Sequence, residues 1–323
     1  MKAIVRTKYG SPDILELLEI NKPDPLDNQV LVRVHAAAVN PLDWHILRGE
    51  PFLVRLMGFG LLKPKHQILG ADMAGRVEAV GKNVIQFKSG DEVFGSSMGG
   101  FAEYACVRED KLVLKPAAIT FEQAAAVPVA GITALQALRD HGRIQAGHYV
   151  LINGASGGVG TFAVQIAKAL GAHVTGVCSG QNLEMVRSIG ADQAIDYTKE
   201  EFWRSGKEYD LILDNAAFQS IRKSLHALQP NGVYVLVGGS SSTATILQSL
   251  ILNPLISRME GRKLVSFMAS VNQPDLAVLE ELLEAGKVVP VIDGKYSLGE
   301  VPQAIRYVEE GHTRGKVVIT VRQ

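Results

Sequence analysis

The sequence is poor in cysteine, has no excess charge of either sign and contains no long apolar run. Its two cysteines, Cys106 and Cys178, lie far apart among the 323 residues, which excludes a disulfide framework or a lobe of cysteine ligands for zinc. The 33 Lys and Arg residues balance 33 Asp and Glu residues without a basic cluster, which argues against nucleic acid as the main partner. No apolar run reaches transmembrane length, and residues 1–6 lack the apolar core of a secretory signal. We therefore expect a soluble, cytoplasmic protein that is long enough for two domains.

The most informative segment is the glycine-rich run at residues 154–160, which reads GASGGVG. It follows an apolar, strand-like run at 149–153 and opens an amphipathic helix over 161–170. Strand, glycine turn and helix in this order form a cradle for a dinucleotide pyrophosphate, because glycines let the backbone approach the phosphates and the helix start supplies N–H groups. The predicted cofactor contacts in this run are Ser156, Gly157, Gly158 and Val159.

The pattern of the chain changes near residue 116. Before it, short alternating strands separated by turns predict a β-rich partial barrel. From residue 149 on, six apolar strands alternate with helices, which is the number in a complete doubly wound Rossmann sheet. We therefore expect an α/β protein with one domain over 1–120, completed by 270–323, and a Rossmann domain over 121–269.

The end of the second Rossmann strand favours NADPH over NADH. In NAD-binding units an Asp or Glu at this point accepts bonds from the ribose 2′-hydroxyl. This chain has Ser179 and Asn182 there, both able to donate to a 2′-phosphate, and Tyr197 after the next strand either adds a hydroxyl or is a packed surface aromatic. The turn has no Arg or Lys for a charge-assisted bond, which is worth about 1.5–3 kcal/mol, so we expect the selectivity to be modest.

Seven segments in order resemble the zinc-independent quinone oxidoreductase branch of the medium-chain dehydrogenase/reductase superfamily, in particular its chloroplast-envelope-type and reticulon-interacting-type enone and quinone reductases. The segments are residues 38–44, 69–75, 87–93, 127–134, 154–160, 190–197 and 315–318. The resemblance implies a GroES-like fold for the first domain and a homodimer in which edge strands of the Rossmann sheets pair. Zinc-dependent relatives carry a Cys near residues 40–43 and a Gly-His-Glu where this chain reads Gly70-Ala71-Asp72, so no zinc is expected.

The resemblance also places candidate catalytic residues beside the nicotinamide. Asn40 either donates its amide to the substrate oxygen or the ribose, or is a turn residue before Pro41. Asp43 either orients its neighbours or caps the following turn. His45 either protonates an enolate as an imidazolium or is only structural. Further cofactor contacts implied by position are Thr133, Asn215, Gly238, Phe267 and Ala269.

Without a metal, the expected chemistry is hydride transfer from NADPH to a small hydrophobic carbonyl compound or quinone that spreads the developing charge. The acceptor is a quinone or the C=C bond of an α,β-unsaturated ketone or aldehyde. One alternative is an NADPH-holding binding or structural protein with little turnover. Another is an enoyl-thioester reductase, although the sequence offers neither a catalytic Tyr after Asp43 nor a basic entrance.

Two apolar segments stand apart from these motifs. Residues 51–62 either line or cover the acceptor site, or form a local packing helix. Residues 245–256 are expected to be a buried helix or loop over the substrate cleft or against a second subunit. Peripheral contact with a membrane surface is the weaker alternative for 245–256, because this segment carries no basic face.

Overall fold

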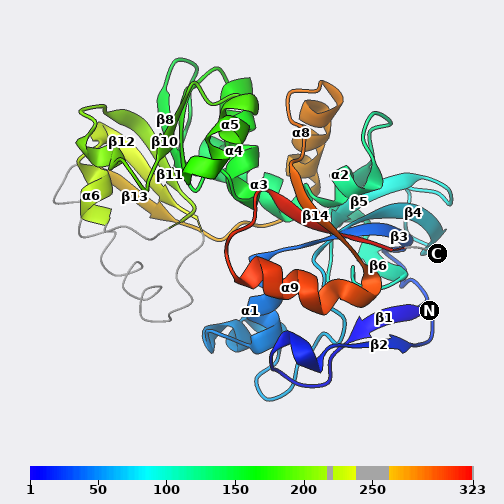
Figure 1. The fold of residues 1–323 in the computed structure, drawn as a ribbon. Coiled ribbons are helices and arrows are strands. Elements are labelled where there is room, and N and C mark those ends of the chain that lie inside the picture. The colour runs from blue at the N-terminus through cyan, green and yellow to red at the C-terminus, as the bar shows by residue number, and fades with distance from the viewer. Residues whose placement is uncertain (217–220, 238–261, 322–323) are drawn as a thin grey trace. The chain divides into compact units, whose positions relative to one another are not determined.

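The computed structural model describes residues 1–216, 221–237 and 262–321, and the chain divides into two compact units (Figure 1). Unit 1 contains Met1–Ile132, Val271–Gly286 and Pro290–Gln323, and unit 2 contains Thr133–Ser270 and Lys287–Val289. The domain predicted over 1–120 therefore ends earlier than unit 1. The difference arises because α2 (Phe121–Ala125) packs against the strands β3 (Gln29–Val39) and β4 (Asp72–Val80) of unit 1.

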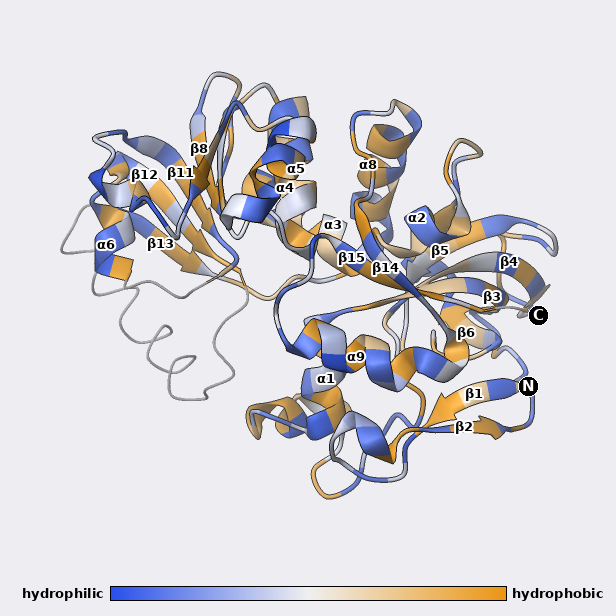
Figure 2. Ribbon diagram, in the orientation of Figure 1, coloured by the Kyte–Doolittle hydropathy of each residue, from blue (hydrophilic) through white to orange (hydrophobic). Residues whose placement is uncertain are grey.

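Unit 2 is built on a parallel six-stranded sheet of order β10-β9-β8-β11-β12-β13. This is the doubly wound Rossmann order, with its first strand, β8, beside its fourth, β11. The strands are apolar in Figure 2 because both faces of a parallel sheet are covered. The strands are β8 (Tyr149–Asn153), β9 (His173–Cys178), β10 (Gln193–Asp196), β11 (Tyr209–Asp214), β12 (Leu228–Leu236) and β13 (Lys263–Ser266), and the helices are α4 (Gly158–Ala169), α5 (Leu183–Ser188) and α6 (Ile221–Leu225).

Unit 1 holds a seven-stranded sheet of order β14-β15-β3-β4-β5-β7, with β6 paired to β3, and a separate hairpin of β1 and β2. All its strand pairs are antiparallel except β14 with β15. The remaining strands are β1 (Lys2–Val5), β2 (Glu16–Glu19), β5 (Glu92–Ser96), β6 (Tyr104–Arg108), β7 (Leu112–Leu114), β14 (Ile292–Ser297) and β15 (Lys316–Thr320). The expected α/β fold, with a Rossmann sheet and a GroES-like sheet, is confirmed.

The C-terminal strand completes unit 1 by pairing with β3. Val317 lies opposite Val39 and Thr320 opposite Ala36. Continued by one residue, this antiparallel register brings Lys316 beside Asn40, although the two are far apart in the sequence.

Helix α1 (Pro41–Arg48) follows β3 directly and packs beside α9 (Val301–Glu309) (Figure 1). The buried face of α9 consists of Val301, Ala304, Ile305 and Val308, at helical spacing. The other helices that contribute to unit 1 are α3 (Pro128–Gln136) and α8 (Gln273–Glu284).

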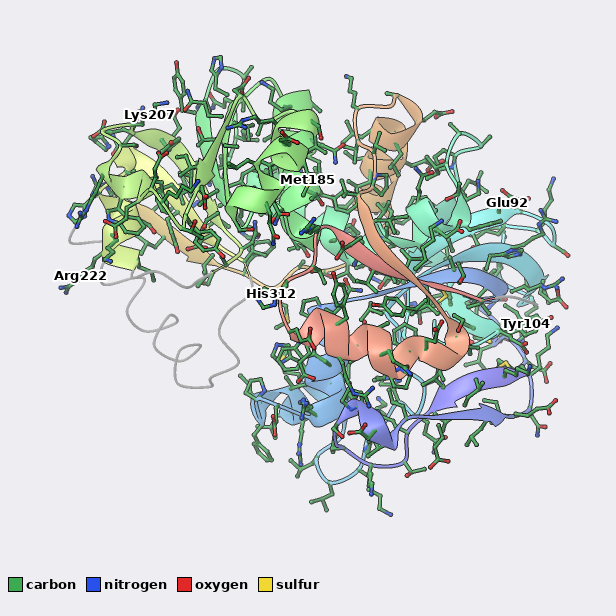
Figure 3. The ribbon with its side chains drawn as sticks, viewed as in Figure 1. Glu92, Tyr104, Met185, Lys207, Arg222 and His312 are labelled. Carbon is green, nitrogen blue, oxygen red and sulfur yellow. The ribbon has the colours of Figure 1, made fainter. Side chains whose placement is uncertain are left out.

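Charged side chains lie mainly on the surface. Glu92, labelled in Figure 3, pairs with Arg76 at 2.8 Å and with Lys115 at 3.2 Å. Such partly exposed pairs stabilise the fold by at most about 1 kcal/mol each. None of the helices in the described ranges is long and apolar enough to cross a membrane.

Candidate active site and cofactor cradle

The glycine run of unit 2 forms the predicted turn between β8 and α4. Gly154 ends the strand with φ +77°, a conformation that favours glycine. At Gly160 an added Cβ would lie 2.1 Å from the Gly154 carbonyl oxygen, so no side chain fits there. At Gly157 the nearest atom would be 3.6 Å away, which leaves room outside the turn. The first N–H groups of α4 have no partner within the helix, so Ser156, Gly157, Gly158 and Val159 lie where an anion would be bound.

The end of β9 carries a cluster of neutral polar groups. The Asn182 amide donates to the Ser156 hydroxyl at 3.2 Å and to the Ser179 hydroxyl at 3.1 Å. The Asn182 Oδ1 atom is buried and has no partner in the described part of the chain. Tyr197 is 59% exposed, and its backbone N–H donates to the Cys178 carbonyl, which brings it next to the β9 end. The structure thus brings together four residues that follow the carboxyl ends of β8, β9 and β10. They are Ser156, Ser179, Asn182 and Tyr197.

A carboxylate that the sequence interpretation missed also reaches this turn. Asp196 ends the neighbouring strand β10 and accepts hydrogen bonds from Thr198 and from the Gly180 backbone N–H. These hydrogen bonds lower the pKa of Asp196, and the bonds from Thr198 have the largest effect. The signal was present in the sequence, because Asp196 is a charged residue at the end of an apolar strand. Its position beside the turn that follows β9 depends on the pairing of β10 with β9. The sequence around Asp196 alone does not indicate that position.

The end of β11 holds a second polar group. Asp214 is fully buried and accepts from the Asn153 amide at 2.9 Å and the Tyr234 hydroxyl at 2.6 Å. Burial is the main cause of the raised pKa of Tyr234, and the adjacent Asp214 raises this pKa further. The Tyr234 hydroxyl therefore stays protonated. The next residue, Asn215, has both side-chain polar atoms buried and without partners among the described residues. Buried polar groups normally have partners, so Asn215 and Asn182, together with the glycine turn, fit a dinucleotide at the carboxyl ends of the strands.

The other predicted cofactor residues are more scattered. Thr133 is buried in α3, Ala269 is half-buried, and Phe267 lies 4.1 Å from the His141 ring. Gly238 and the apolar segment 245–256 lie outside the described residues. Their predicted roles stay predictions.

In unit 1, Asn40 lies at the centre of a buried polar cluster at the start of α1. Its Oδ1 atom accepts a hydrogen bond from Lys316 Nζ at 2.5 Å, and its Nδ2 atom donates to Asp72 Oδ2 at 2.8 Å. Lys316 Nζ also lies 3.4 Å from Asp72 Oδ2. Asp72 accepts a further bond from the Val129 backbone N–H at 3.0 Å. Asn40, Asp72 and Lys316 are 2%, 0% and 3% exposed.

Asp43 ties α1 to the segment before β4. One of its carboxylate oxygens accepts from the Asn40 backbone N–H at 2.8 Å and the other from the Gly70 backbone N–H at 3.1 Å. Burial raises the pKa of Asp43 to about 7. These contacts match the orienting and capping roles considered for Asp43.

His45 is partly buried, and this burial outweighs the hydrogen bond to Glu50 and favours the neutral imidazole. Its Nδ1–H donates to the Glu50 carbonyl at 2.7 Å, and its ring stacks on Trp44 with centroids 3.5 Å apart. Burial lowers the pKa of His45, so the neutral imidazole predominates at pH 7. This environment does not support the imidazolium proposed as proton donor.

The apolar segment 51–62 includes a π-helical turn at Arg55–Phe59 and is largely exposed. Arg55 lies over the rings of Tyr9 and Phe52. The exposed apolar side chains of the segment are Phe52, Leu56, Met57, Leu61 and Leu62. Val54 and Phe59 of the same segment pack against the core of unit 1, while the exposed parts of these five side chains leave apolar surface available to a hydrophobic ligand.

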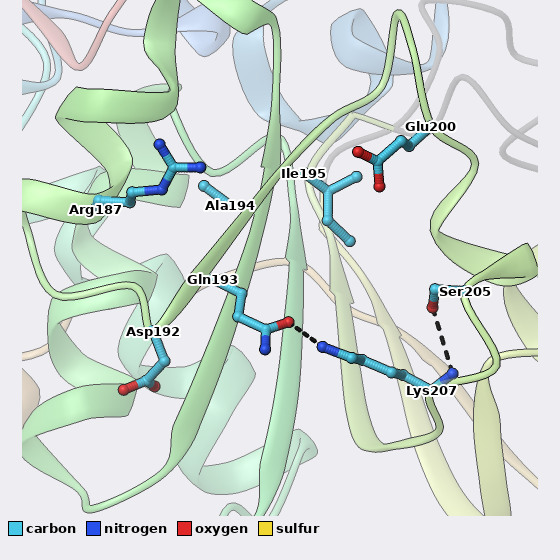
Figure 4. A pocket seen from close by; sticks show the side chains of 8 residues that line it. All are labelled: Arg187, Asp192, Gln193, Ala194, Ile195, Glu200, Ser205 and Lys207. Carbon is cyan, nitrogen blue, oxygen red and sulfur yellow. Dashed lines mark hydrogen bonds between the residues drawn. The ribbon is translucent and has the colours of Figure 1, made fainter.

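An open pocket of about 360 Å³ lies on the outer side of edge strand β10 in unit 2 (Figure 4). Lys207 reaches across it to Gln193 Oε1. Its lining residues are Arg187, Asp192, Gln193, Ala194, Ile195, Glu200, Ser205 and Lys207, which carry both signs of charge. None of them belongs to the predicted site, and the pocket favours no class of ligand.

Asp72 and Lys316 are the functional candidates that sequence reasoning did not single out, although both occur in segments that carry the family resemblance. Each is a charged residue at the first, buried position of a strand, β4 and β15, and the three residues that follow it are also buried. That position was the available signal.

The residues around Asn40 do not fit a zinc ion. Zinc requires about three N, S or O ligands, and neither Asn40 nor Ala71 supplies a thiolate or an imidazole. The Asn40 oxygen faces the Lys316 ammonium at 2.5 Å. Among the residues that the structure describes, no group of three or more His, Cys, Asp or Glu residues is arranged to hold a metal ion.

Comparison with known proteins agrees with this architecture. Residues 26–117 match the model of the alcohol dehydrogenase GroES-like domain, and residues 189–319 match that of the zinc-binding dehydrogenases. The chain is 36% identical over 361 residues to NAD(P)H oxidoreductase RTN4IP1, mitochondrial, of Bos taurus, covering 99% of this chain and 89% of that protein. It is 35% identical to 2-methylene-furan-3-one reductase of Solanum lycopersicum, covering 99% of this chain and 79% of that protein.

Two solved structures share both units. The quinone oxidoreductase from Coxiella burnetii has a TM-score of 0.88 at 31% identity, covering 100% of this chain and 99% of that one. The Escherichia coli quinone oxidoreductase complexed with NADPH has a TM-score of 0.83 at 27% identity, covering 99% and 100%. A Rossmann sheet and a GroES-like sheet in one chain define a class of nicotinamide-dependent oxidoreductases. The chain belongs to the medium-chain dehydrogenase/reductase superfamily, in which its homologues include quinone oxidoreductases.

Proposed function

We propose that the protein is an NADPH-dependent reductase of conjugated acceptors, either quinones or α,β-unsaturated ketones and aldehydes, that works without zinc. The observation that carries the proposal is the buried Asn40 amide, held between Lys316 and Asp72. The glycine cradle of unit 2 supports a nicotinamide cofactor. The relatives named as NAD(P)H oxidoreductase and furanone reductase support the reaction class.

Bound NADPH supplies a hydride for transfer to a carbon of the acceptor. The chain's own residues then need to align the acceptor and to donate hydrogen bonds to the oxygen on which negative charge collects. Asn40 has a second Nδ2–H besides the one given to Asp72, and we assign it this donor role. The exposed apolar side chains of 51–62 suit a hydrophobic acceptor, which is chosen by apolar contact more than by charge.

The preference for NADPH rests on the neutral cluster of Ser179, Asn182 and Ser156 at the end of β9 and on the similarity to a quinone oxidoreductase complexed with NADPH. Asp196 is engaged by Thr198 and Gly180, but its charge lies near the same turn. We therefore expect NADPH to be preferred by no more than about tenfold. This factor corresponds to the lower limit of the free energy of one charge-assisted hydrogen bond, about 1.5 kcal/mol.

The test is an assay of the purified protein with a panel of enones, enals and quinones, each with NADPH and with NADH. We expect turnover with at least one acceptor class and a higher kcat/KM with NADPH. In Asn182→Asp, the added carboxylate is expected to shift the preference toward NADH, and Asn182→Ser is the neutral control. Equal kcat/KM for the two cofactors in the wild type would contradict the cofactor preference. Absence of turnover with the whole panel, with NADPH binding retained, would instead favour a cofactor-holding protein.

A companion test uses the glycine cradle. Gly157→Ala has space for its methyl group within the fold, but Gly157 is the N-cap residue of α4, where Ala is less favourable than Gly, so a small loss of thermal stability is expected. The methyl group would stand where the pyrophosphate approaches the backbone, so NADPH binding, followed by cofactor fluorescence, is expected to weaken about tenfold or more, as when one phosphate contact is lost. Unchanged affinity would show that the cofactor does not lie in this turn.

A further inference from the structure

The Lys316 side chain is a buried charge that contacts two polar side chains, those of Asn40 and Asp72. Its Nζ atom is 2.5 Å from Asn40 Oδ1 and 3.4 Å from Asp72 Oδ2, and the residue is 3% exposed. The Nζ atom has no other hydrogen-bond partner in the described part of the chain, although its charge also acts on the Asp43 carboxyl group. Burying an ammonium group costs several kcal/mol before its partners compensate, and an apolar residue would suit this strand equally well. The contacts of Lys316 therefore require an explanation beyond packing.

The backbone at the start of α1 is held by hydrogen bonds that do not involve the Lys316 ammonium, although the charge of Lys316 also lowers the pKa of Asp43. The Asn40 carbonyl accepts from the Asp43 backbone N–H at 2.9 Å, and the Asn40 N–H donates to Asp43 Oδ2 at 2.8 Å. These two bonds hold the backbone at the helix N-terminus. The ammonium group contacts only the Asn40 side-chain amide and the carboxylate beside it, so it fixes a side chain and leaves the main-chain bonds to other groups.

The two charges fix which way the amide points. A carboxylate accepts and cannot donate, while an ammonium donates and cannot accept. Asp72 therefore selects the Nδ2 end of Asn40 and Lys316 selects the Oδ1 end. A flip of the amide would place oxygen against carboxylate and NH₂ against ammonium. The orientation with an Nδ2–H left for a ligand is the one that both neighbours stabilise.

We propose that Lys316 is a positioning residue for hydride transfer, which orients and polarises the Asn40 amide so that its remaining N–H donates to the acceptor oxygen. This inference rests on the proposed function. A fixed positive charge at Oδ1 draws electron density from the amide and strengthens its N–H as a donor, and neighbouring hydrogen bonds reinforce one another in a buried site. Asp72 balances the charge and holds the other Nδ2–H. In this way the cluster offers the acceptor oxygen a preorganised hydrogen-bond donor, the Asn40 N–H. A metal ion is not needed for this role.

The test is a double-mutant cycle with Asn40→Ala, Lys316→Met and the double variant, assayed with the best acceptor of the panel. Removing one donor to a developing oxyanion costs about 10²-fold or more in kcat, which we expect for Asn40→Ala. Lys316→Met is expected to lower kcat about tenfold or more by weakening that donor, with KM for NADPH unchanged. The double variant is expected to be no slower than Asn40→Ala, because Lys316 acts through Asn40.

A merely structural lysine gives a different pattern. In that case Lys316→Met lowers the melting temperature and the folded fraction but leaves kcat per folded molecule unchanged. The loss of total activity in the double variant is then the product of the losses in the two single variants. Because Lys316→Met leaves the Asp72 carboxylate buried without its cation, the charge-neutral pair Lys316→Met with Asp72→Asn is measured beside it. This double replacement leaves no buried charge unpaired, but it also removes the carboxylate that selects the Nδ2 end of Asn40, so a loss of kcat at least as large as that of Lys316→Met is expected.

Multiplicative losses, or a wild-type kcat in both Lys316 variants, would overturn the inference while leaving the proposed function intact. A wild type that turns over no acceptor refutes the proposed function instead. The arms of the cycle thus separate the two failures.

Discussion

Asp43 is expected to make the stability of unit 1 fall as the pH rises from 5 to 8. Its carboxyl group is fully buried, and burial raises its pKa from the ordinary value of 3.8 to about 7. At pH 5 the folded chain binds a proton that the unfolded chain has released. The stability contributed by this proton is present below the unfolded-state pKa and is lost as the pH rises through the folded-state pKa. Applied to these two pKa values, the linkage relation gives a loss of about 2–3 kcal/mol between pH 5 and pH 8.

The protein offers a reporter for each unit, because its two tryptophans are Trp44 in unit 1 and Trp203 in unit 2. In a Trp203→Phe background, urea unfolding followed by the fluorescence of Trp44 reports on unit 1. Asp43→Asn removes the titrating group, so the free energy of unfolding of the parent is expected to fall relative to the variant by about 2–3 kcal/mol across this pH range. Asp27→Asn, which changes an exposed carboxylate, is the control and keeps the parent's pH dependence. A difference between parent and Asp43→Asn that stays constant from pH 5 to pH 8 would refute the reasoning.

Three further outcomes are expected. Tyr234→Phe removes the 2.6 Å bond to Asp214 and is expected to lower the unfolding free energy of unit 2, read from Trp203 fluorescence, by about 1.5–3 kcal/mol; no change would mean that water replaces the phenol at no cost. Gly160→Ala places a methyl group 2.1 Å from a backbone oxygen and is expected to lower the melting temperature of unit 2, and wild-type stability in this variant would contradict the tight turn. His45→Phe is expected to leave the pH dependence of kcat/KM between pH 6 and 8 unchanged, because burial lowers the pKa of His45; a lost limb of the profile would restore the acid role.

The fold could be predicted because its signals are local. The glycine turn lies directly between an apolar strand and an amphipathic helix, so residues 149–170 define a complete βα unit without any long-range information. Strand and helix alternation then fixed the sheet type. Helix α9 was missed, although its buried residues Val301, Ala304, Ile305 and Val308 recur at helical spacing.

The site could be predicted only in part, because its geometry depends on strand pairing. Ser156 and Asn182 were recognisable as polar residues after two strands, and the parallel sheet brings them together. Asp196 reaches the same turn from a third strand, which nothing in its local sequence indicates. Lys316 meets Asn40 only because β15 pairs with β3 in one particular register. A shift of one residue would turn the side chain to the other face of the sheet.

Helix α1 is held at both ends by buried charge. At its C-terminus the fully buried Arg6 guanidinium donates to the Ile46 carbonyl at 2.5 Å and the Leu47 carbonyl at 3.3 Å, where the helix dipole favours a cation. Burial lowers the pKa of Arg6 to about 10, which leaves it charged at neutral pH. At the N-terminus, Asp43 fixes the backbone and Lys316 the Asn40 amide.

Apolar residues of similar volume often stabilise a core as well as a buried ion pair does. The cost of burying these charges is therefore better explained by the position of one side chain than by stability. A hydrophobic contact holds a helix against its neighbours, but it cannot distinguish the oxygen of an amide from its nitrogen. A carboxylate and an ammonium on either side of Asn40 can, and the direction of that amide is what the proposed reaction requires.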